Sequence, residues 1–476
     1  MEFEPVIGLE IHVELKTKSK MFSNGPVLFG AEPNTLVVPL DMGFPGTMPV
    51  VNKEAVIYAI RVSNALHMKI DHELHFDRKN YFYSDLPKGY QITQNLRPIG
   101  SDGYLEIEVD GKTKRINIER LHMEEDTCKQ LHFNTFTLLD YNRAGTPLVE
   151  IVSRPDIRCG EEAMKYVEKI RSIVVFSEVS DGKMEEGSLR CDVNISLREK
   201  GTEPFGTKVE IKNINSISHI QRAVDFEIAR QSKILNEGGT IAQETRRYDD
   251  AKRETILMRV KTDAVDYKYF PEPNIIPIKL SDEFVNAAIA SCPELAESKK
   301  ERYLNEFKLN DYDASLLVSD KDISVYYDNC AKLTKQYKIL ANWINVDVLS
   351  YLNKNNCTIN EFPLSPEQLV SLIAIIEKNE VSSNQAKSIF NKMVEEKCDA
   401  QKARQILGIS SQISDESFIK NVIKEVLDEN PQSIKDYKEG KDRALGFMVG
   451  QVMKKTQGKV NPKMTSEMLL KELENR

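Results

Sequence analysis

The stretch of residues 6–15, VIGLEIHVEL, has the alternating pattern of a β-strand with one apolar and one polar face. Its odd positions are all apolar, namely Ile7, Leu9, Ile11, Val13 and Leu15. Its even positions include Glu10, His12 and Glu14. Because successive side chains of a strand point to opposite faces, we expect the apolar set to pack on a core while the acids and the histidine share the other face.

Acidic residues occur in four further short runs. Asp192 lies on the polar face of RCDVNISL, and Glu210 lies on the polar face of KVEIKN. Glu150 interrupts the apolar run PLVEIVS, and Glu124 and Glu125 belong to HMEED. An acid inside an apolar run is costly to bury unless it is paired or bound to a metal.

Two interpretations of these acids stay open from the residues alone. The acids either cover the solvated faces of an antiparallel sheet, which is common, or converge to hold divalent ions. Carboxylate oxygens with one imidazole suit Mg²⁺ or Mn²⁺ better than zinc. Alternation does not show that the strands meet in space.

The pattern of apolar, polar and turn-forming residues along the chain predicts an α+β protein with three domains. The 476 residues are too many for one core. Short alternating runs separated by Gly, Pro, Asn and Asp predict an antiparallel sheet in residues 1–292. Helical periodicity then predicts an all-α region in residues 293–408, in which Ser365 and Asn384 are expected helix N-caps. Residues 409–476 are expected to form a small helical tail.

The composition predicts a cytoplasmic protein that does not enter a membrane. No run approaches the roughly 18 apolar residues that a span needs, and the N-terminus MEFEPVIGLE has acids where a secretory signal would be basic. The seven cysteines form no CxxC pair, which indicates free thiols in a reducing compartment. The net charge of −8 means that any nucleic acid must bind to a local basic patch.

Two familiar signatures are missing from the sequence. There is no GxxxxGK[ST] phosphate-binding loop, so ATP would not bind on a P-loop. There is also no Ser/Gly-rich amidase signature with a paired Ser and Lys. We therefore expect that the chain does not hydrolyse glutamine by itself, and that a partner supplies any such activity.

Ordered motifs across residues 5–273 resemble the B subunits of the tRNA-dependent amidotransferases, the family of the three-subunit GatCAB enzyme. They include GLEIHVELKTKSKMFS, FPGTMPVVN, FDRKNYFYSDLPKGYQITQ, HMEED, DYNRAGTPLVEIVSRPD, MEEGSLRCDVNIS, GTKVEIKNINS and QETRRYD. The tail NPQSIKDYKEGKDRALGFMVGQVMKKTQGKVNP resembles the C-terminal tRNA-binding module of that family. The resemblance implies a glutamine-synthetase-like catalytic cradle.

The resemblance also implies an activity. The family uses ATP to phosphorylate the side-chain carboxylate of Glu on misacylated tRNA(Gln), and often of Asp on tRNA(Asn). Ammonia then displaces phosphate, giving Gln-tRNA(Gln) or Asn-tRNA(Asn). The ammonia comes from the amidase (A) subunit, and a small (C) subunit braces this heterotrimer. The alternative from another class is a non-catalytic tRNA-binding scaffold whose acids are structural.

The resemblance assigns expected roles to individual residues. The metal ligands are expected to be His12, Glu125, Glu150, Glu10, Glu124, Asp192 and Glu210, which hold Mg²⁺ or Mn²⁺. Four of these, Glu10, Glu124, Asp192 and Glu210, are expected to form the ATP site. Catalytic roles are expected for Glu125, Lys79, Lys88 and Arg190.

Alternatives stay open for the basic residues. Lys79 and Lys88, with Tyr81, Tyr83 and Tyr90, either line the mouth of the cavity or belong to a rigid packed loop. Arg190 either contacts phosphate or pairs with a neighbouring acid. In the tail, the run KKTQGKVNPK at residues 454–463 contains no acid, so it is either a phosphate-binding patch or a solvated helix end.

The sequence departs from the family in two places. Many relatives carry zinc-binding cysteines in the early loop, but FSNGPVLFGAEPNTLVVPLDMG has none. We therefore expect no zinc and a loop held by packing. Residues 260–268 also differ from the usual sequence of the family, so we assign no functional roles to individual residues in that stretch.

Overall fold

The computed structural model describes residues 2–260, 266–409, 416–438, 441, 443–456, 460 and 462–474. Residues 261–265, in the stretch that departs from the family wording, lie outside this set. The chain forms two compact units, Met1–Ala296 and Glu297–Arg476. No helix in the described residues is long and apolar enough to cross a membrane.

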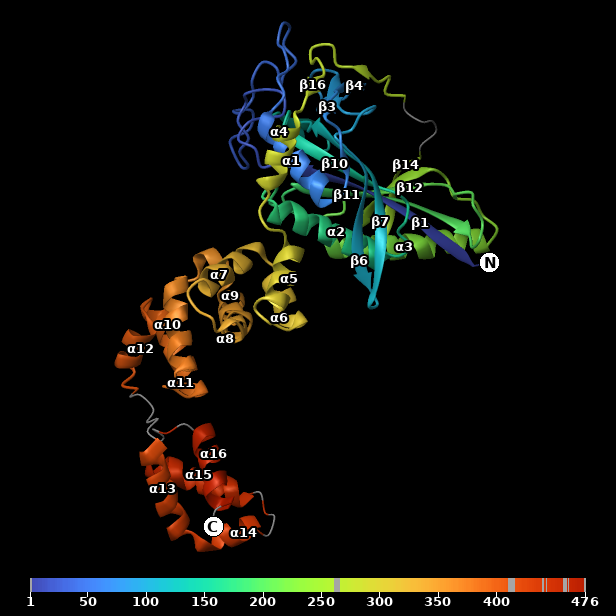
Figure 1. Ribbon diagram of the computed structural model, residues 1–476. Coiled ribbons are helices and arrows are strands. Elements are labelled where there is room, and N and C mark those ends of the chain that lie inside the picture. Colours follow the sequence, from blue (N-terminus) through green and yellow to red (C-terminus); the bar gives the residue numbers. More distant parts are fainter. Residues whose placement is uncertain are drawn as a thin grey trace. The chain divides into compact units, whose positions relative to one another are not determined.

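A nine-stranded sheet is the centre of the first unit (Figure 1). The strands in spatial order are β14 (Glu254–Val260), β13 (Glu244–Asp249), β12 (Val209–Lys212), β11 (Leu189–Glu199), β1 (Phe3–Glu14), β10 (Pro147–Ser153), β7 (Lys112–Glu125), β6 (Gly100–Val109) and β2 (Lys69–Ile70). The α+β prediction is confirmed, but the sheet is mixed because β12 and β13 pair in parallel. The other neighbouring pairs are antiparallel, as the sequence predicted.

Three helices cover one face of this sheet. They are α1 (Lys53–Ala65), α2 (Gly160–Phe176) and α3 (Ile217–Asn236), and their apolar sides join the sheet in one core. The core contains the apolar set of β1, with Ile7 and Ile11 fully buried. The alternation in residues 6–15 therefore predicted the strand and its dry face correctly. Glu10 and His12 consequently lie on the face that these helices leave open.

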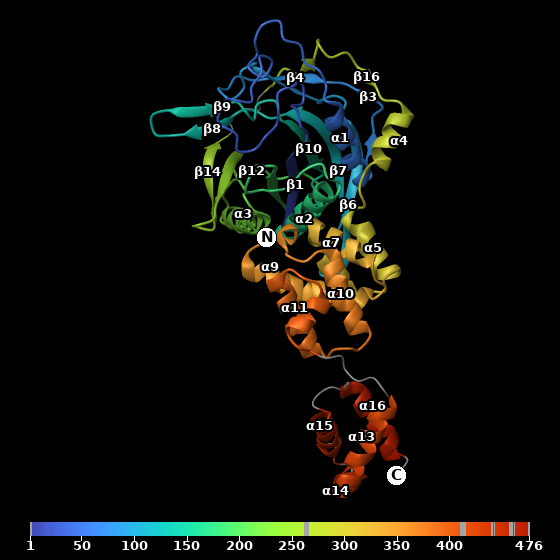
Figure 2. The same cartoon turned by 90° about the vertical axis from the view of Figure 1, so that its left-hand side faces the viewer.

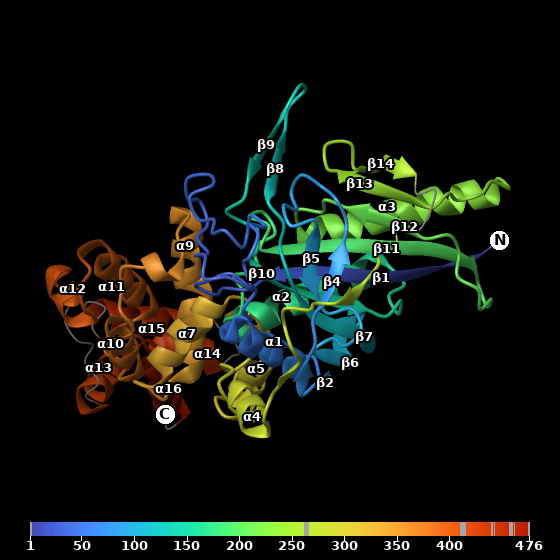
Figure 3. The same ribbon diagram turned by 90° about the horizontal axis from the view of Figure 1, so that it is seen from above.

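Smaller elements complete the first unit. Strands β15 (Phe270–Pro271), β4 (Asp77–Asn80) and β5 (Tyr90–Thr93) form a three-stranded sheet, and β3 (Glu73–Leu74) pairs with β16 (Ile278–Lys279). Helix α4 (Asp282–Ala290) packs against α1. The hairpin of β8 (Lys129–His132) and β9 (Thr137–Asp140) projects from the unit (Figure 2, Figure 3).

A buried ion pair anchors the long loop between β1 and α1. Lys20 Nζ lies 2.7 Å from Asp41 Oδ2, and neither side chain is exposed to solvent. Asp41 also accepts hydrogen bonds from Ser23 Oγ and from the amide of Val38. Packing was expected to hold this cysteine-free loop, and a buried charge pair with its hydrogen bonds is at its centre.

The regular elements in the described residues of the second unit are helices and helical turns. Its elements are α5 (Ala296–Asn305), α6 (Asp311–Leu317), α7 (Lys321–Ala331), α8 (Tyr337–Trp343), a π-helical turn (Ile344–Val348), α9 (Leu349–Asn355), a 3₁₀ turn (Ile359–Glu361), α10 (Pro366–Glu377), α11 (Ser383–Glu396), α12 (Ala400–Ile406), α13 (Glu416–Glu429), α14 (Pro431–Lys438), α15 (Arg443–Lys455) and α16 (Pro462–Glu474). Two separate apolar cores lie in residues 303–403 and 419–473. The predicted boundary near residue 408 falls between these cores and stays a prediction.

The expected helix caps are half right. Ser365 caps α10 and forms a capping box with Gln368, as the sequence predicted. The cap of α11 is Ser382, not Asn384, and it forms a capping box with Gln385. Ser382 caps the helix because its hydroxyl accepts a hydrogen bond from the Gln385 amide, while the Gln385 side-chain oxygen accepts one from the Ser382 amide.

Candidate functional site

An acidic cavity of about 300 Å³ lies on the face of the sheet opposite α1, α2 and α3. Five strands of the large sheet contribute to it, and Lys79 of β4 and two tyrosines before β15 enter it from outside that sheet. Its lining residues are Glu10, His12, Lys79, Thr93, Gln94, Asn95, Arg120, His122, Glu124, Glu150, Asp192, Glu210, Lys212, Tyr267 and Tyr269. The acidic runs of the sequence therefore do converge.

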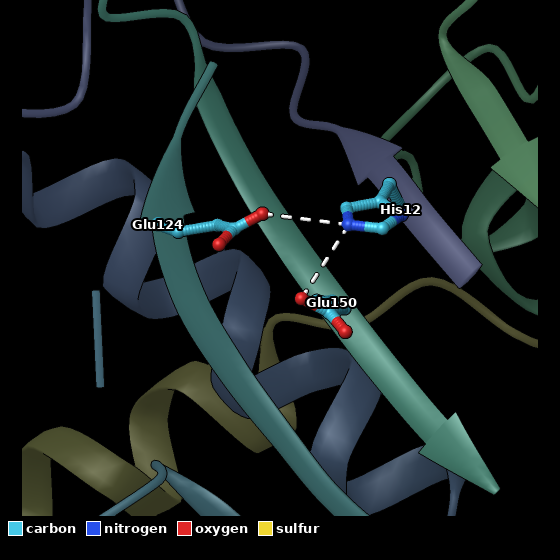
Figure 4. Close-up of side chains that lie close together, drawn as sticks. All are labelled: His12, Glu124 and Glu150. Atoms are coloured by element: carbon cyan, nitrogen blue, oxygen red, sulfur yellow. Dashed lines mark ion pairs between the residues drawn. The ribbon is translucent and has the colours of Figure 1, made fainter. Parts of the chain in front are cut away.

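The first cluster in this cavity consists of His12, Glu124 and Glu150 (Figure 4). Strand register explains their approach, because Glu150 of β10 is paired with His12 of β1 on one side and with His122 of β7 on the other. His12 Nε2 lies 3.6 Å from Glu124 Oε1 and 3.4 Å from Glu150 Oε2. The potential ligand atoms of the three residues all lie within 4.8 Å of one another.

The acids of the first cluster and the two histidines beside them shift one another's pKa. Burial by itself would lower the pKa of His122, but Glu150 and Glu124 outweigh burial and raise that pKa to about 9. The pKa of His12 is raised for the same reason. Burial would raise the pKa of Glu150, yet His122 and His12 hold it well below its usual range.

The second cluster consists of Glu10, Asp192 and Glu210, whose potential ligand atoms also lie within 4.8 Å of one another. Glu10 is directly opposite Asp192 in the β1–β11 ladder. Asn194 Nδ2 donates to Glu10 Oε1 at 2.9 Å, and Thr245 Oγ1 donates to Glu210 Oε2 at 3.0 Å. Burial, together with Glu150 and Asp192, raises the pKa of Glu10.

The donor sets of both clusters fit hard divalent cations. One cluster offers an imidazole nitrogen and two carboxylates, and the other offers three carboxylates. Oxygen-rich sets of this kind match Mg²⁺ or Mn²⁺, while the structural zinc sites of proteins are usually built from cysteine and histidine. Hydrogen bonds from Asn194 and Thr245 orient the carboxylates of the second cluster, as outer residues do around metal sites.

Two family models match the chain. The model described as the GatB/GatE catalytic domain matches residues 5–286, and the model described as the GatB domain matches residues 325–473. The chain belongs to the GatB family. The first match contains both clusters, so the acidic cavity lies in the part of the GatB family fold that its description calls catalytic.

Relatives named as the B subunit of aspartyl/glutamyl-tRNA(Asn/Gln) amidotransferase are similar to this GatB family chain over its full length. The proteins of Bacillus cereus (strain AH187) and Staphylococcus carnosus (strain TM300) are 50% identical over 476 residues, which is 100% of both chains in each comparison. The protein of Bacillus licheniformis (strain ATCC 14580) is 50% identical over 477 aligned residues, again 100% of both chains. The family resemblance predicted from the motifs is confirmed.

Lys79 lines the cavity, but the predicted tyrosines around it are not the ones that do so. Tyr267 and Tyr269 line the cavity with Lys79, whereas Tyr81 does not. The Lys79 ammonium is 5.0 Å from the centre of the Tyr267 ring. Burial would lower the pKa of Lys79, but the nearby Glu124 and other negative groups raise it. The sequence of residues 260–268, which departs from the family pattern, gave no signal for Tyr267 or for the adjacent Tyr269.

The structure separates Glu125 and Lys88 from both clusters. Alternation along β7 turns Glu125 away from the face of Glu124. Its carboxylate accepts hydrogen bonds from Lys88 Nζ at 2.5 and 2.6 Å and from the amide of Ile92 at 3.0 Å. A metal-ligand role for Glu125 therefore has no support in this geometry, and a catalytic role for the pair would be exerted outside the acidic cavity.

Arg190 adopts the ion-paired alternative. It is paired with His12 in the β1–β11 ladder, and its Nη2 donates to Asp126 Oδ2 at 2.7 Å. Arg143 lies 3.5 Å from the same carboxylate oxygen. Arg190 does not line the cavity, so direct contact with a phosphate has no support here. Arg120, His122 and Lys212 do line the cavity and were not among the predicted site residues.

Proposed function

We propose that this protein activates a side-chain carboxylate on misacylated tRNA with ATP, as one component of a multi-subunit amidotransferase. The substrates are Glu-tRNA(Gln), Asp-tRNA(Asn) or both, as the names of the relatives indicate. The observation that carries the proposal is the pair of carboxylate clusters in one cavity of the matched catalytic domain. A solvated sheet face would have no reason to gather five buried or half-buried acids around one cavity.

The proposed reaction has two balanced steps. The substrate carboxylate attacks the γ-phosphorus of ATP, the bond to the bridging oxygen breaks, and ADP leaves. Ammonia then attacks the acyl phosphate, loses a proton, and expels phosphate to leave the amide. Phosphoryl transfer of this kind depends mainly on positioning and on compensation of charge.

The residues of the cavity have distinct proposed roles. His12, Glu124 and Glu150 would hold one Mg²⁺ or Mn²⁺, and Glu10, Asp192 and Glu210 would hold a second. Bound there, such ions polarise phosphoryl oxygens and neutralise developing charge. Lys79, Lys212 and Arg120 bring positive charge to the same cavity, where they orient anionic oxygens.

Partner chains follow from the chemistry that this chain lacks. The sequence has no amidase signature, so ammonia must come from another chain, which we propose to be the amidase (A) subunit, braced by the small (C) subunit. The hairpin β8–β9 supports such assembly. Its side chains Leu131, Phe133, Phe136 and Leu138 share one face and are each about half exposed. An apolar face on an isolated hairpin is typical of a contact surface.

Nucleotide cleavage separates the proposed enzyme from a tRNA-binding scaffold. We expect the assembled heterotrimer to form ADP only when misacylated tRNA and Mg²⁺ are both present, because the substrate carboxylate is the phosphoryl acceptor. The measurement is ADP release with charged tRNA, with uncharged tRNA and without tRNA. Binding of tRNA without ADP formation under any of these conditions would favour the scaffold.

Two lysines of the helical tail are already paired with acids, so fewer lysines remain for the proposed binding of tRNA than its sequence suggests. Lys455 Nζ lies 2.7 Å from Glu429 Oε1 and 3.3 Å from Glu425 Oε2, and Lys441 pairs with Asp436. Lys454 is exposed and has no ion pair within the described part of the chain. Lys459, in the predicted basic run, lies outside the described residues, as does the side chain of Lys463. We propose that Lys454 is one of the phosphate contacts.

Deleting residues after about 408 is expected to weaken tRNA binding and to flatten its salt dependence. The logarithm of the tRNA association constant falls as the logarithm of the salt concentration rises. Each lost phosphate contact makes this negative slope less steep by about 0.7 to 0.9. Lys454→Ala is expected to remove about one contact, while the neighbouring Lys455→Ala, whose ammonium is already paired, leaves the slope unchanged. Filter binding at several salt concentrations measures both, and equal effects of the two substitutions would contradict the assignment.

A further inference from the structure

Lys212 occupies the second carboxylate cluster with its own positive charge. It ends β12, two residues after Glu210, so both side chains point to the cavity face. Its Nζ lies 2.7 Å from Asp192 Oδ2 and 3.1 Å from Glu210 Oε1. The ammonium therefore binds two of the three acids that form the candidate cation site.

An ammonium in this position opposes the binding of a divalent ion at the same carboxylates. An ion bound by Asp192 lies about 2.1 Å from its ligand oxygen, which would place it within about 5 Å of the Lys212 nitrogen in its present position. Two cations at that separation in a poorly hydrated site repel strongly. The ion would also compete with Lys212 for the carboxylates of Asp192 and Glu210. Entry of the ion is therefore favoured when Lys212 leaves Asp192 and Glu210.

Lys79 shows that this arrangement is specific to Lys212. Both lysines line the same cavity. The Lys79 ammonium lies over the rings of Tyr267 and Tyr81, and no hydrogen bond or ion pair joins it to a carboxylate in the described residues. If the acidic cavity needed only positive charge, Lys79 and Lys212 would be equivalent. Of these two lysines, Lys212 is the one whose ammonium binds oxygens of the second cluster.

We propose that Lys212 is a built-in counter-cation that keeps the second metal site closed until a metal and a polyphosphate arrive together. When the metal enters, the displaced ammonium turns to the polyphosphate oxygens, which replace the carboxylates as its partners. The closed site rests only on the contacts of Lys212, while the transfer to a polyphosphate also rests on the proposed function. The consequence is cooperative binding of metal and polyphosphate. The polyphosphate gives the displaced Lys212 new partners, and the metal frees Lys212 to bind the polyphosphate.

The first test measures metal binding to the full chain without nucleotide. Mn²⁺ is titrated into the wild type, Lys212→Met and Lys79→Met, and free Mn²⁺ is followed by electron paramagnetic resonance. Loss of a charge-assisted contact from the competing lysine is expected to tighten the weaker Mn²⁺ site of Lys212→Met about 10- to 100-fold. Lys79→Met controls for the general change of charge and is expected to show a clearly smaller effect.

Thermal unfolding gives a second readout that does not depend on activity. Lys212→Met leaves two acids without their cation, so its unfolding temperature in chelator is expected to fall, and Mn²⁺ is expected to raise it by more than in the wild type. Lys212→Gln, which keeps a hydrogen-bond donor, should show the same trend if Lys212→Met folds poorly. Equal Mn²⁺ affinities in Lys212→Met and Lys79→Met, or weaker binding in Lys212→Met, would overturn the closed site.

The final arm adds a non-hydrolysable ATP analogue. In the wild type the analogue is expected to tighten the second Mn²⁺ site, and in Lys212→Met this coupling is expected to fall at least about fivefold. Full coupling in Lys212→Met would overturn the transfer of Lys212 to the polyphosphate. Failure of the wild type to bind the analogue would instead contradict the proposed use of ATP, with the metal-only result standing separately.

Discussion

Glu150→Gln is expected to lower the rate of tRNA-dependent ADP formation about 1000-fold or more. Metal ions supply several kcal/mol of transition-state stabilisation in phosphoryl transfer, and each 1.36 kcal/mol corresponds to a factor of ten. The Glu150 carboxylate lies 3.4 Å from His12 of the first cluster and 3.1 Å from the neighbouring His122. The amide has the same size, but it lacks the charge that a divalent ion needs.

The measurement combines steady-state ADP release by the heterotrimer with Mn²⁺ titration of the full chain. Glu150→Gln is expected to lose one Mn²⁺ ion, while its affinity for tRNA stays that of the wild type. Glu125→Gln is the matched control because it makes the same change in a neighbouring buried glutamate that faces Lys88 instead. It is expected to retain both ions. Wild-type turnover in Glu150→Gln, or the loss of a metal in Glu125→Gln only, would reject the assignment of the first cluster.

The alternation of apolar and polar residues predicted which face of each strand a side chain occupies. The pairing register between neighbouring strands, which the sequence did not show, determines which of those side chains lie close together. The alternation of residues 6–15 correctly separated Ile7 and Ile11 from Glu10 and His12. Alternation also distinguishes Glu124 from Glu125, but the resemblance grouped the two as adjacent acids. The β1–β10–β7 register then brings Glu124, Glu150 and His12 together and leaves Glu125 with Lys88.

Other features of the site depend on tertiary structure that no short pattern encodes. Tyr267 and Tyr269 reach the cavity because the segment leading into β15 pairs with β4, far away in the sequence. The parallel β12–β13 pair has a similar origin, since parallel strands need a long crossover, and α3 supplies it. Lys212 was visible only as a lysine flanking Glu210. Its role follows from Asp192, which lies on another strand.

A second large effect is expected on the stability of the first unit, from Lys20→Met. Removing one partner of a buried ion pair typically costs about 3 to 5 kcal/mol, because the other charge stays buried without compensation. Here that charge is Asp41, which would retain its bonds from Ser23 and Val38. Gly145 shows how tightly the pair is enclosed. It has φ +85°, and a Cβ added there would lie 3.1 Å from Asp41 Oδ1.

Hydrogen exchange followed by mass spectrometry is the suitable measurement, because the single tryptophan, Trp343, lies in the second unit and does not report on this loop. The amide of Met21 donates to the Gly145 carbonyl, that of Val50 to Phe22, and that of Asn52 to Met21. The protection of these three amides from hydrogen exchange should therefore fall in Lys20→Met. Lys18 is exposed and lies in the same loop, so Lys18→Met should change the free energy of unfolding by no more than about 0.5 kcal/mol.

The double variant Lys20→Met/Asp41→Asn decides whether charge or shape holds the loop. Neutralising Asp41 removes the uncompensated charge while leaving an oxygen for Ser23 and Val38, so more than half of the lost protection should return. Persistent loss in the double variant would mean that the lysine acts through packing. The outcome bears on the site, because the loop containing Asp41 lies against Lys88, where a Cβ added to Gly43 would approach the Lys88 backbone to 3.1 Å. In this member of the family, a loop without cysteines would then depend on a buried charge pair to hold Lys88 beside Glu125.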